Sequence, residues 1–188
     1  MRRVLRSGRC LLCSAFLAIF FSCSEVKPAE KLGGEMIKTG SFPEGSVTDR
    51  SENNIADKWL FLKTDPARAR YVITNGVCVI ILDSPGIKIS EVQLAYIPCS
   101  LKFGIPYRVS FDAMADSPRY LFFRIGRIGG KGLSYSGLRS FELTSYWQTI
   151  SFVFRSISSD DSAMLEFDCA KEKPTIYFSN VSMKPILE

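Results

Sequence analysis

The sequence contains no histidine among its 188 residues. This absence excludes Ser-His-Asp and Cys-His triads, zinc sites built on imidazole, and acid–base catalysis by histidine. Long apolar runs are also missing: the run at residues 11–21 is interrupted by Ser14 and is too short to cross a bilayer as a helix. With 46% hydrophobic and 23% charged residues, the chain can bury a core and is neither wholly disordered nor collagen-like.

The N-terminal segment has the features of an export signal. Four arginines precede the apolar run, and no acidic residue occurs before Cys23. A basic region followed by a short apolar region is typical of a signal peptide. The sequence therefore predicts a signal peptide over residues 1–22. Residues 23–34 are polar and aperiodic, and we expect them to form a flexible tether.

The end of the apolar run, Phe20-Phe21-Ser22-Cys23, resembles the lipobox of bacterial lipoproteins, in which a small residue precedes the acylated cysteine. The usual pattern has leucine where this chain has Phe20, a departure that spirochaetal lipoboxes allow. The resemblance implies that Cys23 carries acyl chains such as palmitate and becomes the mature N-terminus. The protein would then be anchored to a membrane of the cell envelope, at the periplasmic leaflet or the cell surface. The alternative is a cleaved signal peptide with an unmodified Cys23.

The excess of positive charge belongs to the export signal. Without the four leader arginines, the 24 basic residues fall to 20, against 19 acidic residues. A nearly neutral chain does not indicate a patch that tracks nucleic-acid phosphates. Nucleic-acid binding is therefore not expected.

Three cysteines follow Cys23, namely Cys78, Cys99 and Cys169. An exported compartment permits one disulfide among them. Cys78 and Cys169 stand in apolar runs, where a buried thiol packs as a small apolar residue. The three cysteines have neither CxxC nor metal-ligand spacing, so redox chemistry is not expected.

From Met36 onward, short segments of period two are separated by Gly, Pro, Asn and Ser. Apolar and polar residues alternate over residues 107–114, and similar alternation recurs at residues 120–125, 149–154 and 164–169. Segments of this length, separated by turn-forming residues, predict strands. No stretch shows a helical apolar stripe longer than about two turns. The sequence therefore predicts an all-β domain over residues 35–188, a two-sheet antiparallel β-sandwich (jelly roll).

Five segments, in this order, resemble the carbohydrate-binding module superfamily of families 4, 9 and 22. They are Gly104–Ala113, Arg119–Gly126, Leu143–Gln148, Ala163–Phe167 and Ile176–Ser182. Gly40-Ser41-Phe42 resembles the opening strand of the family, and Trp59 falls where its early tryptophan does. The resemblance covers roughly residues 35 to 188. It implies a galactose-binding-like jelly roll that binds glycans and does no chemistry.

Alternation predicts which side chains face outward. If the apolar members of residues 120–125 and 164–169 face the core, the residues between them face outward. The resemblance places both segments on the concave sheet, which carries the ligand in cleft-binding members, and it adds a glutamine-bearing strand. A tyrosine in the Gly-rich loop at residues 126–137 could flank the cleft. Aromatic rings would lie under the sugar while polar groups bind its hydroxyls. The candidate carbohydrate-binding residues are Tyr120, Phe122, Arg124, Glu166, Asp168, Gln93 and Tyr135.

Other interpretations remain open. Arg124 could simply pair with Glu166 or Asp168, and any sandwich shows a mixed face to water. Glu166 and Asp168 could also act as the carboxyl pair of a glycosidase. Acids two residues apart on a strand are common, however. No catalytic residue is therefore expected, and the chain is not expected to be an enzyme. Trp59 and Trp147 are predicted to pack in the core or at an edge. The alternative function is a structural or protein-interaction lipoprotein of the envelope that keeps the jelly roll and has lost sugar binding.

A structural calcium is common in the family, held by carboxylates near the opening and closing strands. At the matching positions this chain has Pro43 and Ser179. Glu44 and Asn180 could still offer oxygen atoms, but calcium sites usually need several oxygen ligands, carboxylates among them. No cofactor is expected, and the sequence leaves open whether a structural calcium is bound.

Overall fold

The computed structural model describes residues 30–49, 58–127 and 134–187. The predicted signal peptide, Cys23 and most of the predicted tether lie outside these ranges. The described residues form strands and one short 3₁₀ helix, and none of their helices is long and apolar enough to span a membrane. The strands are β1 (Lys31–Leu32), β2 (Val47–Asp49), β3 (Lys58–Lys63), β4 (Arg68–Thr74), β5 (Val77–Ser84), β6 (Val92–Leu101), β7 (Pro106–Ala115), β8 (Arg119–Arg127), β9 (Arg139–Leu143), β10 (Gln148–Arg155), β11 (Asp160–Asp168) and β12 (Ile176–Leu187).

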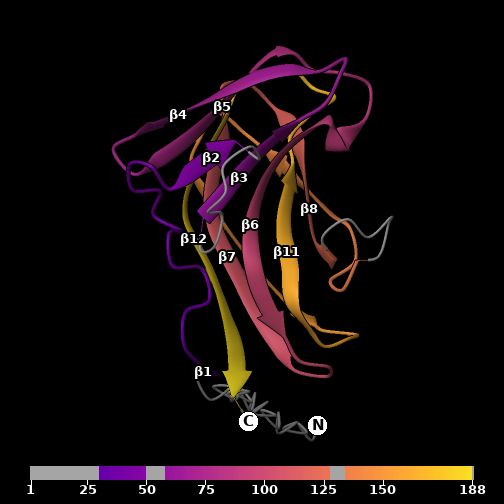
Figure 1. Ribbon diagram of the computed structural model, residues 1–188. Helices are drawn as coiled ribbons and strands as arrows, with labels where there is room; N and C mark the ends of the chain where they lie inside the picture. Colours follow the sequence, from indigo (N-terminus) through magenta and orange to yellow (C-terminus); the bar gives the residue numbers. More distant parts are fainter. Residues whose placement is uncertain (1–29, 50–57, 128–133, 188) are drawn as a thin grey trace, which may run out of the picture.

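The strands form two sheets that pack face to face (Figure 1). The β6–β11 sheet has the order β2-β3-β6-β11-β8-β9, and the β7–β12 sheet has the order β10-β7-β12-β5-β4, with β1 added to β12. All pairs are antiparallel except β2 with β3. The predicted all-β sandwich is confirmed.

Phe167 of β11 lies at the centre of the core between the sheets. Its ring centroid is 4.9 Å from those of Phe111 and Phe178, 5.4 Å from Phe123 and 6.1 Å from Trp59. All five rings are fully buried. Because this ring faces inward, the residues on either side of it in β11 must face outward.

The first strand extends the domain into the predicted tether. Lys31 pairs with Leu187 and Leu32 with Ile186, and the backbone N–H of Gly33 donates to the Pro185 carbonyl at 2.8 Å. The sheet therefore begins before residue 35. Polar composition suggested a tether here, but backbone pairing with β12 does not depend on apolar side chains.

The two tryptophans lie in different environments. Trp59 is fully buried, as predicted, and its indole Nε1 donates to the Thr39 carbonyl at 3.2 Å. Trp147 is 48% exposed and therefore does not lie in the core; it directly precedes β10, which is an edge strand of its sheet. Trp147 directly precedes Gln148, which lies opposite the inward-facing Ala113, so alternation turns the indole outward.

Cys78, Cys99 and Cys169 are free thiols buried in the core. The disulfide that export would permit is thus not formed among them. Burial raises the pKa of Cys99 to about 12 and that of Cys169 to about 12. These thiols pack as small apolar side chains and are protonated at neutral pH.

Candidate functional site

The outer face of the β6–β11 sheet carries two rows of side chains that run across its strands. Because Phe167 faces the core, Glu166 and Asp168 point to this outer face. Strand register aligns them with residues of β3, β6, β8 and β9. The first row consists of Leu62, Gln93, Asp168, Phe122 and Ser140, and the second of Leu60, Ala95, Glu166 and Arg124.

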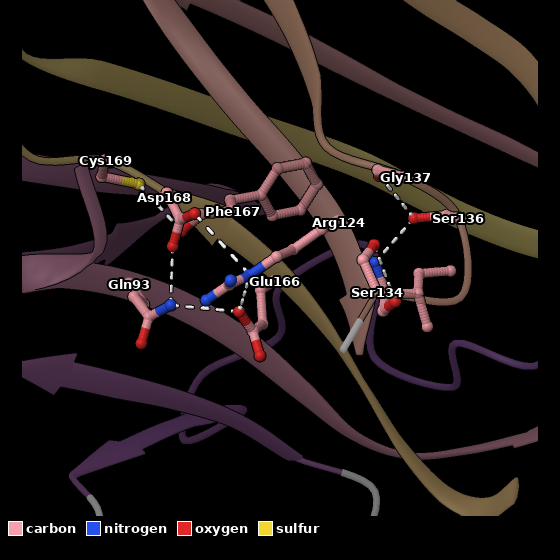
Figure 2. Close-up of polar contacts among 10 residues, drawn as sticks. Gln93, Arg124, Ser134, Ser136, Gly137, Glu166, Phe167, Asp168 and Cys169 are labelled. Atoms are coloured by element: carbon pink, nitrogen blue, oxygen red, sulfur yellow. Dashed lines mark hydrogen bonds and ion pairs between the residues drawn. The ribbon is translucent and has the colours of Figure 1, made fainter. Parts of the chain in front are cut away.

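Four polar side chains of these rows form one hydrogen-bonded network, here called the quartet: Gln93, Arg124, Glu166 and Asp168 (Figure 2). Gln93 Nε2 donates to Glu166 Oε2 at 3.1 Å and to Asp168 Oδ1 at 2.6 Å. Arg124 Nε donates to Glu166 Oε2 at 2.6 Å and lies 3.8 Å from Asp168 Oδ2. The structure thus joins residues from β6, β8 and β11, which are distant in the sequence.

The two carboxylates of the quartet are buried although they face outward. Their side chains are 5% exposed for Glu166 and 1% exposed for Asp168. Burial raises the pKa of both carboxyl groups, while Arg124 and the Gln93 amide partly oppose that rise. Among the described residues, Asp168 Oδ2 has no hydrogen-bond partner. One guanidinium therefore compensates two buried acids.

Arg124 is the most accessible ionised member of the quartet, with a side chain that is 28% exposed. Its hydrogen bonds within the described part of the chain use Nε alone. A guanidinium has five N–H donors in a planar fork. The quartet therefore orients Arg124 through Nε, and the Nη1 and Nη2 groups keep their donors for another acceptor.

An apolar cluster lies beside the quartet on the same face. Leu60, Ala95 and Ile97 form it, and the partly buried Leu62 and Met164 pack against it. Sequence analysis did not identify this cluster as part of the face. The apolar residues of the cluster are visible in the sequences of β3 and β6. Both strands are apolar on both faces, however, so alternation alone does not separate core from surface.

The two aromatic candidates of β8 lie at the other side of the quartet. Phe122 is half-buried and is the Cα partner of Asp168 across the β8–β11 pair. Tyr120 is 50% exposed, and its backbone N–H donates to the Glu172 carboxylate at 3.2 Å. Together with the apolar cluster, these rings border the polar centre of the face.

Tyr135 does not flank this face, contrary to expectation. Ser134 pairs with Gly126 of β8, so period two directs the next side chain, Tyr135, into the core, where it is 4% exposed. Figure 2 shows Ser134 and Ser136, the residues on either side of Tyr135. Its hydroxyl donates to Asp160 Oδ2 at 2.6 Å, and this bond raises the pKa of Tyr135 and lowers that of Asp160.

Pro43 and Ser179, which stand at the positions of the family's calcium ligands, supply no carboxylate. Of the two residues beside them that could offer oxygen atoms, Glu44 is exposed, and Asn180 Nδ2 donates to Asp112 Oδ2 at 2.7 Å. No group of three or more His, Cys, Asp or Glu side chains that could hold a metal occurs in the described ranges. Calcium sites draw on several such oxygens.

Comparisons with known proteins agree with this geometry. Residues 34–174 match the family described as a carbohydrate-binding domain, families 4 and 9. A solved family 4 carbohydrate-binding module is 28% identical with a TM-score of 0.71, over 79% of this chain and 99% of that one.

Two cellulose-binding domains of β-1,4-glucanase C from Cellulomonas fimi share the fold. The N-terminal one is 15% identical with a TM-score of 0.56, over 70% of this chain and 91% of that one. The second is 20% identical with a TM-score of 0.57, over 69% of this chain and 86% of that one. A search among curated proteins found no match. Because the family match spans most of the chain, from just after β1 to just before β12, the chain belongs to the carbohydrate-binding domain family of families 4 and 9.

Proposed function

We propose that this protein is a noncatalytic glycan-binding lipoprotein, which holds a polysaccharide or glycoconjugate on the outer face of its β6–β11 sheet. Membership of the carbohydrate-binding domain family supports the ligand class. The observation that carries the choice of face is the guanidinium of Arg124, which is fixed through Nε and keeps its Nη donors.

Sugar hydroxyls are acceptors as well as donors, so the Nη groups of Arg124 would donate to one or two of them. The acids of the quartet hold the guanidinium in place before the ligand arrives. Less conformational entropy is then lost on binding, because the long side chain is already ordered.

The aromatic rings of β8 supply the apolar part of the contact. Pyranose rings present C–H groups on one face, and a half-exposed ring such as Tyr120 offers a matching flat surface. Phe122 and the apolar cluster around Leu60 continue that surface on both sides of Arg124.

The same geometry favours binding over hydrolysis. A glycosidase needs one carboxyl to reach the glycosidic oxygen and another to reach the anomeric carbon or a water. Here Glu166 and Asp168 are both nearly inaccessible and share the Gln93 amide and the Arg124 guanidinium. They are suited to orienting Arg124.

The test is retention of the protein in native gels that contain hydroxyethyl cellulose, xylan, mannan or mixed-linkage β-glucan. We expect Arg124→Ala and Tyr120→Ala to weaken retention by about tenfold or more, because each removes a contact worth about 1.4 kcal/mol or more. Arg127→Ala is the matched control, since Arg127 lies on the same strand and is 66% exposed.

Thermal melting of each variant separates loss of binding from loss of fold. Unchanged retention of both Arg124→Ala and Tyr120→Ala, in proteins that retain the wild-type melting temperature, would contradict the choice of face. Failure of the wild-type protein to bind any glycan would contradict the function itself and favour a protein-interaction role.

The membrane anchor is a further part of this proposal. It rests on the pattern Phe20-Phe21-Ser22-Cys23 and on the basic and apolar segments before it. Acyl chains on Cys23 would tether the domain to the cell envelope through the short segment before β1.

A further inference from the structure

Trp147 is a large, partly exposed aromatic side chain whose role the proposed function does not explain. It lies in the turn between β9 and β10 and is 48% exposed, and the neighbouring Tyr146 is 78% exposed. Exposing an indole to water costs free energy unless a ligand or partner covers it. Tryptophan is also enriched where binding energy is concentrated.

The turn that carries Trp147 is well fixed. The backbone N–H of Ala115 donates to the Thr144 carbonyl at 2.9 Å, and the backbone N–H of Tyr146 donates to Thr144 Oγ1 at 3.3 Å. Gln148 Nε2 donates to the Glu142 carbonyl at 2.8 Å. The indole is therefore presented on a pre-ordered turn, so little backbone entropy is lost when a ligand covers it.

A small cavity of about 170 Å³ adjoins the indole. It lies on the outer face of the β7–β12 sheet, because Asp112, Thr149 and Ser179 alternate with core residues of β7, β10 and β12. This face is on the opposite side of the sandwich from the quartet. The cavity is lined by Asp112, Trp147, Gln148, Thr149 and Ser179.

The polar groups of this cavity are already oriented. Thr149 Oγ1 donates to Asp112 Oδ1 at 2.6 Å, and Asn180 Nδ2 donates to Asp112 Oδ2 at 2.7 Å. A carboxylate has about four acceptor sites, so two remain on Asp112 after these bonds. The Ser179 hydroxyl adds a group that can donate and accept.

From this arrangement we infer a second sugar-binding site, which takes a single pyranose unit of a neutral glycan. The ring of Trp147 lies under the apolar face of the sugar, while Asp112 and its neighbours bind hydroxyl groups. The cavity is smaller than the roughly 300–1,000 Å³ of most small-molecule pockets, and this size suits one sugar unit. The inference shares the ligand class of the proposed function but not its face.

A second site on the opposite side changes what the protein can do. Two sheets of a sandwich lie about 10 Å apart, and one glycan chain cannot follow both outer faces at once. The module would therefore hold two chains, or two parts of a branched glycan, and gain avidity from the pair.

The experiment uses tryptophan fluorescence, which this chain makes selective. It has two tryptophans, and Trp59 is fully buried, so glycan-dependent changes in emission and in acrylamide quenching report on Trp147. The full chain is titrated with cellohexaose, xylohexaose and mannohexaose, and with the polysaccharides that retain it in gels. We expect a shift in emission and at least about a twofold fall in the quenching constant at saturation.

The variants separate the two sites. Trp147→Ala should weaken binding at this site by about tenfold, and Trp147→Phe, which keeps a smaller ring, should weaken it less. Phe103→Ala is the matched control, because Phe103 is 70% exposed in the β6–β7 turn and does not line this cavity. Arg124→Ala should leave the fluorescence response in place.

Each result has one meaning. If the wild-type protein binds a glycan while emission and quenching of Trp147 stay constant, or if Trp147→Ala binds as the wild type does, the second site is wrong and the first remains. If Trp147→Ala removes binding and Arg124→Ala does not, the second site is supported and the quartet face is wrong. If no glycan binds, both proposals are wrong.

Discussion

At the scale of single residues, the quartet contains two buried acids and one cation, so its charges are not balanced. Glu166 and Asp168 are both buried, and the cation that faces them in the network is Arg124. Removing one partner of a buried ionic network usually costs more than the network contributes, because a charge is left without compensation. Substitutions in the quartet must therefore be judged by folding as well as by binding.

The buried acids predict how stability depends on pH. Burial raises the pKa of Glu166 and Asp168 above their ordinary values of 4.5 and 3.8, so the folded state binds protons more tightly than the unfolded state. Their contribution to the free energy of unfolding is complete below those ordinary values and is lost as the pH rises through the folded-state pKa. Lowering the pH from neutral towards these ordinary values is thus expected to stabilise the fold through these two groups.

Urea denaturation at several pH values measures this effect, with Glu166→Gln and Asp168→Asn as comparison. The pKa values of Asp160 and Glu35 are lowered, so acidification destabilises the fold through these two groups. This contribution is present in the wild type and in both variants, and it cancels when their pH dependences are compared. We expect a smaller gain on acidification in both variants than in the wild type. Equal pH dependence in all three proteins would show that the acids are not perturbed in this way.

At the scale of elements, Arg119 joins the start of β8 to the segment between β11 and β12. Its side chain is buried and donates to the carbonyls of Cys169 at 2.6 Å, Pro174 at 2.6 Å and Glu172 at 3.1 Å. The bonds fix the end of β8 that carries Tyr120. Arg119 thus supports the candidate face without belonging to it.

We expect Arg119→Lys to lower the free energy of unfolding by roughly 2–4 kcal/mol, because an ammonium cannot reproduce a planar fork that bonds several carbonyls and some of them would be left unpaired. Arg127→Lys, at the exposed end of the same strand, is the control and should change it by less than about 0.5 kcal/mol. Urea denaturation compares the two. Similar stability of both variants would show that these carbonyls find other partners.

At the scale of the whole molecule, β1 and the end of β12 lie together at one end of the sandwich (Figure 1). Only seven residues separate Cys23 from Lys31, so a lipid on Cys23 would hold this end within about 30 Å of the membrane. Both candidate sugar sites lie on outer faces of the sheets, to the sides of that end. Anchoring and glycan binding are therefore compatible in one molecule.

The anchor predicts that the protein expressed in a lipoprotein-processing bacterium enters the detergent phase on Triton X-114 separation and incorporates labelled palmitate. Cys23→Ala should move it to the aqueous phase, because the acyl chains supply the membrane affinity. Binding to glycans should not change. Wild-type protein that stays in the aqueous phase and takes up no palmitate would contradict acylation while leaving the glycan proposal intact.

Period-two alternation determined from the sequence which side chains of β8 and β11 face outward, because a strand leaves only two directions for them. The same pattern predicted the buried residues around Phe167 and the sandwich itself. Tyr135 was misplaced because it lies outside the long regular strands, where the register of a neighbouring strand decides the direction of a side chain. Only tertiary structure brought Gln93 within hydrogen-bonding distance of Glu166 and Asp168, since strand order joins residues 73 and 75 positions apart and sequence spacing carries no information on that pairing.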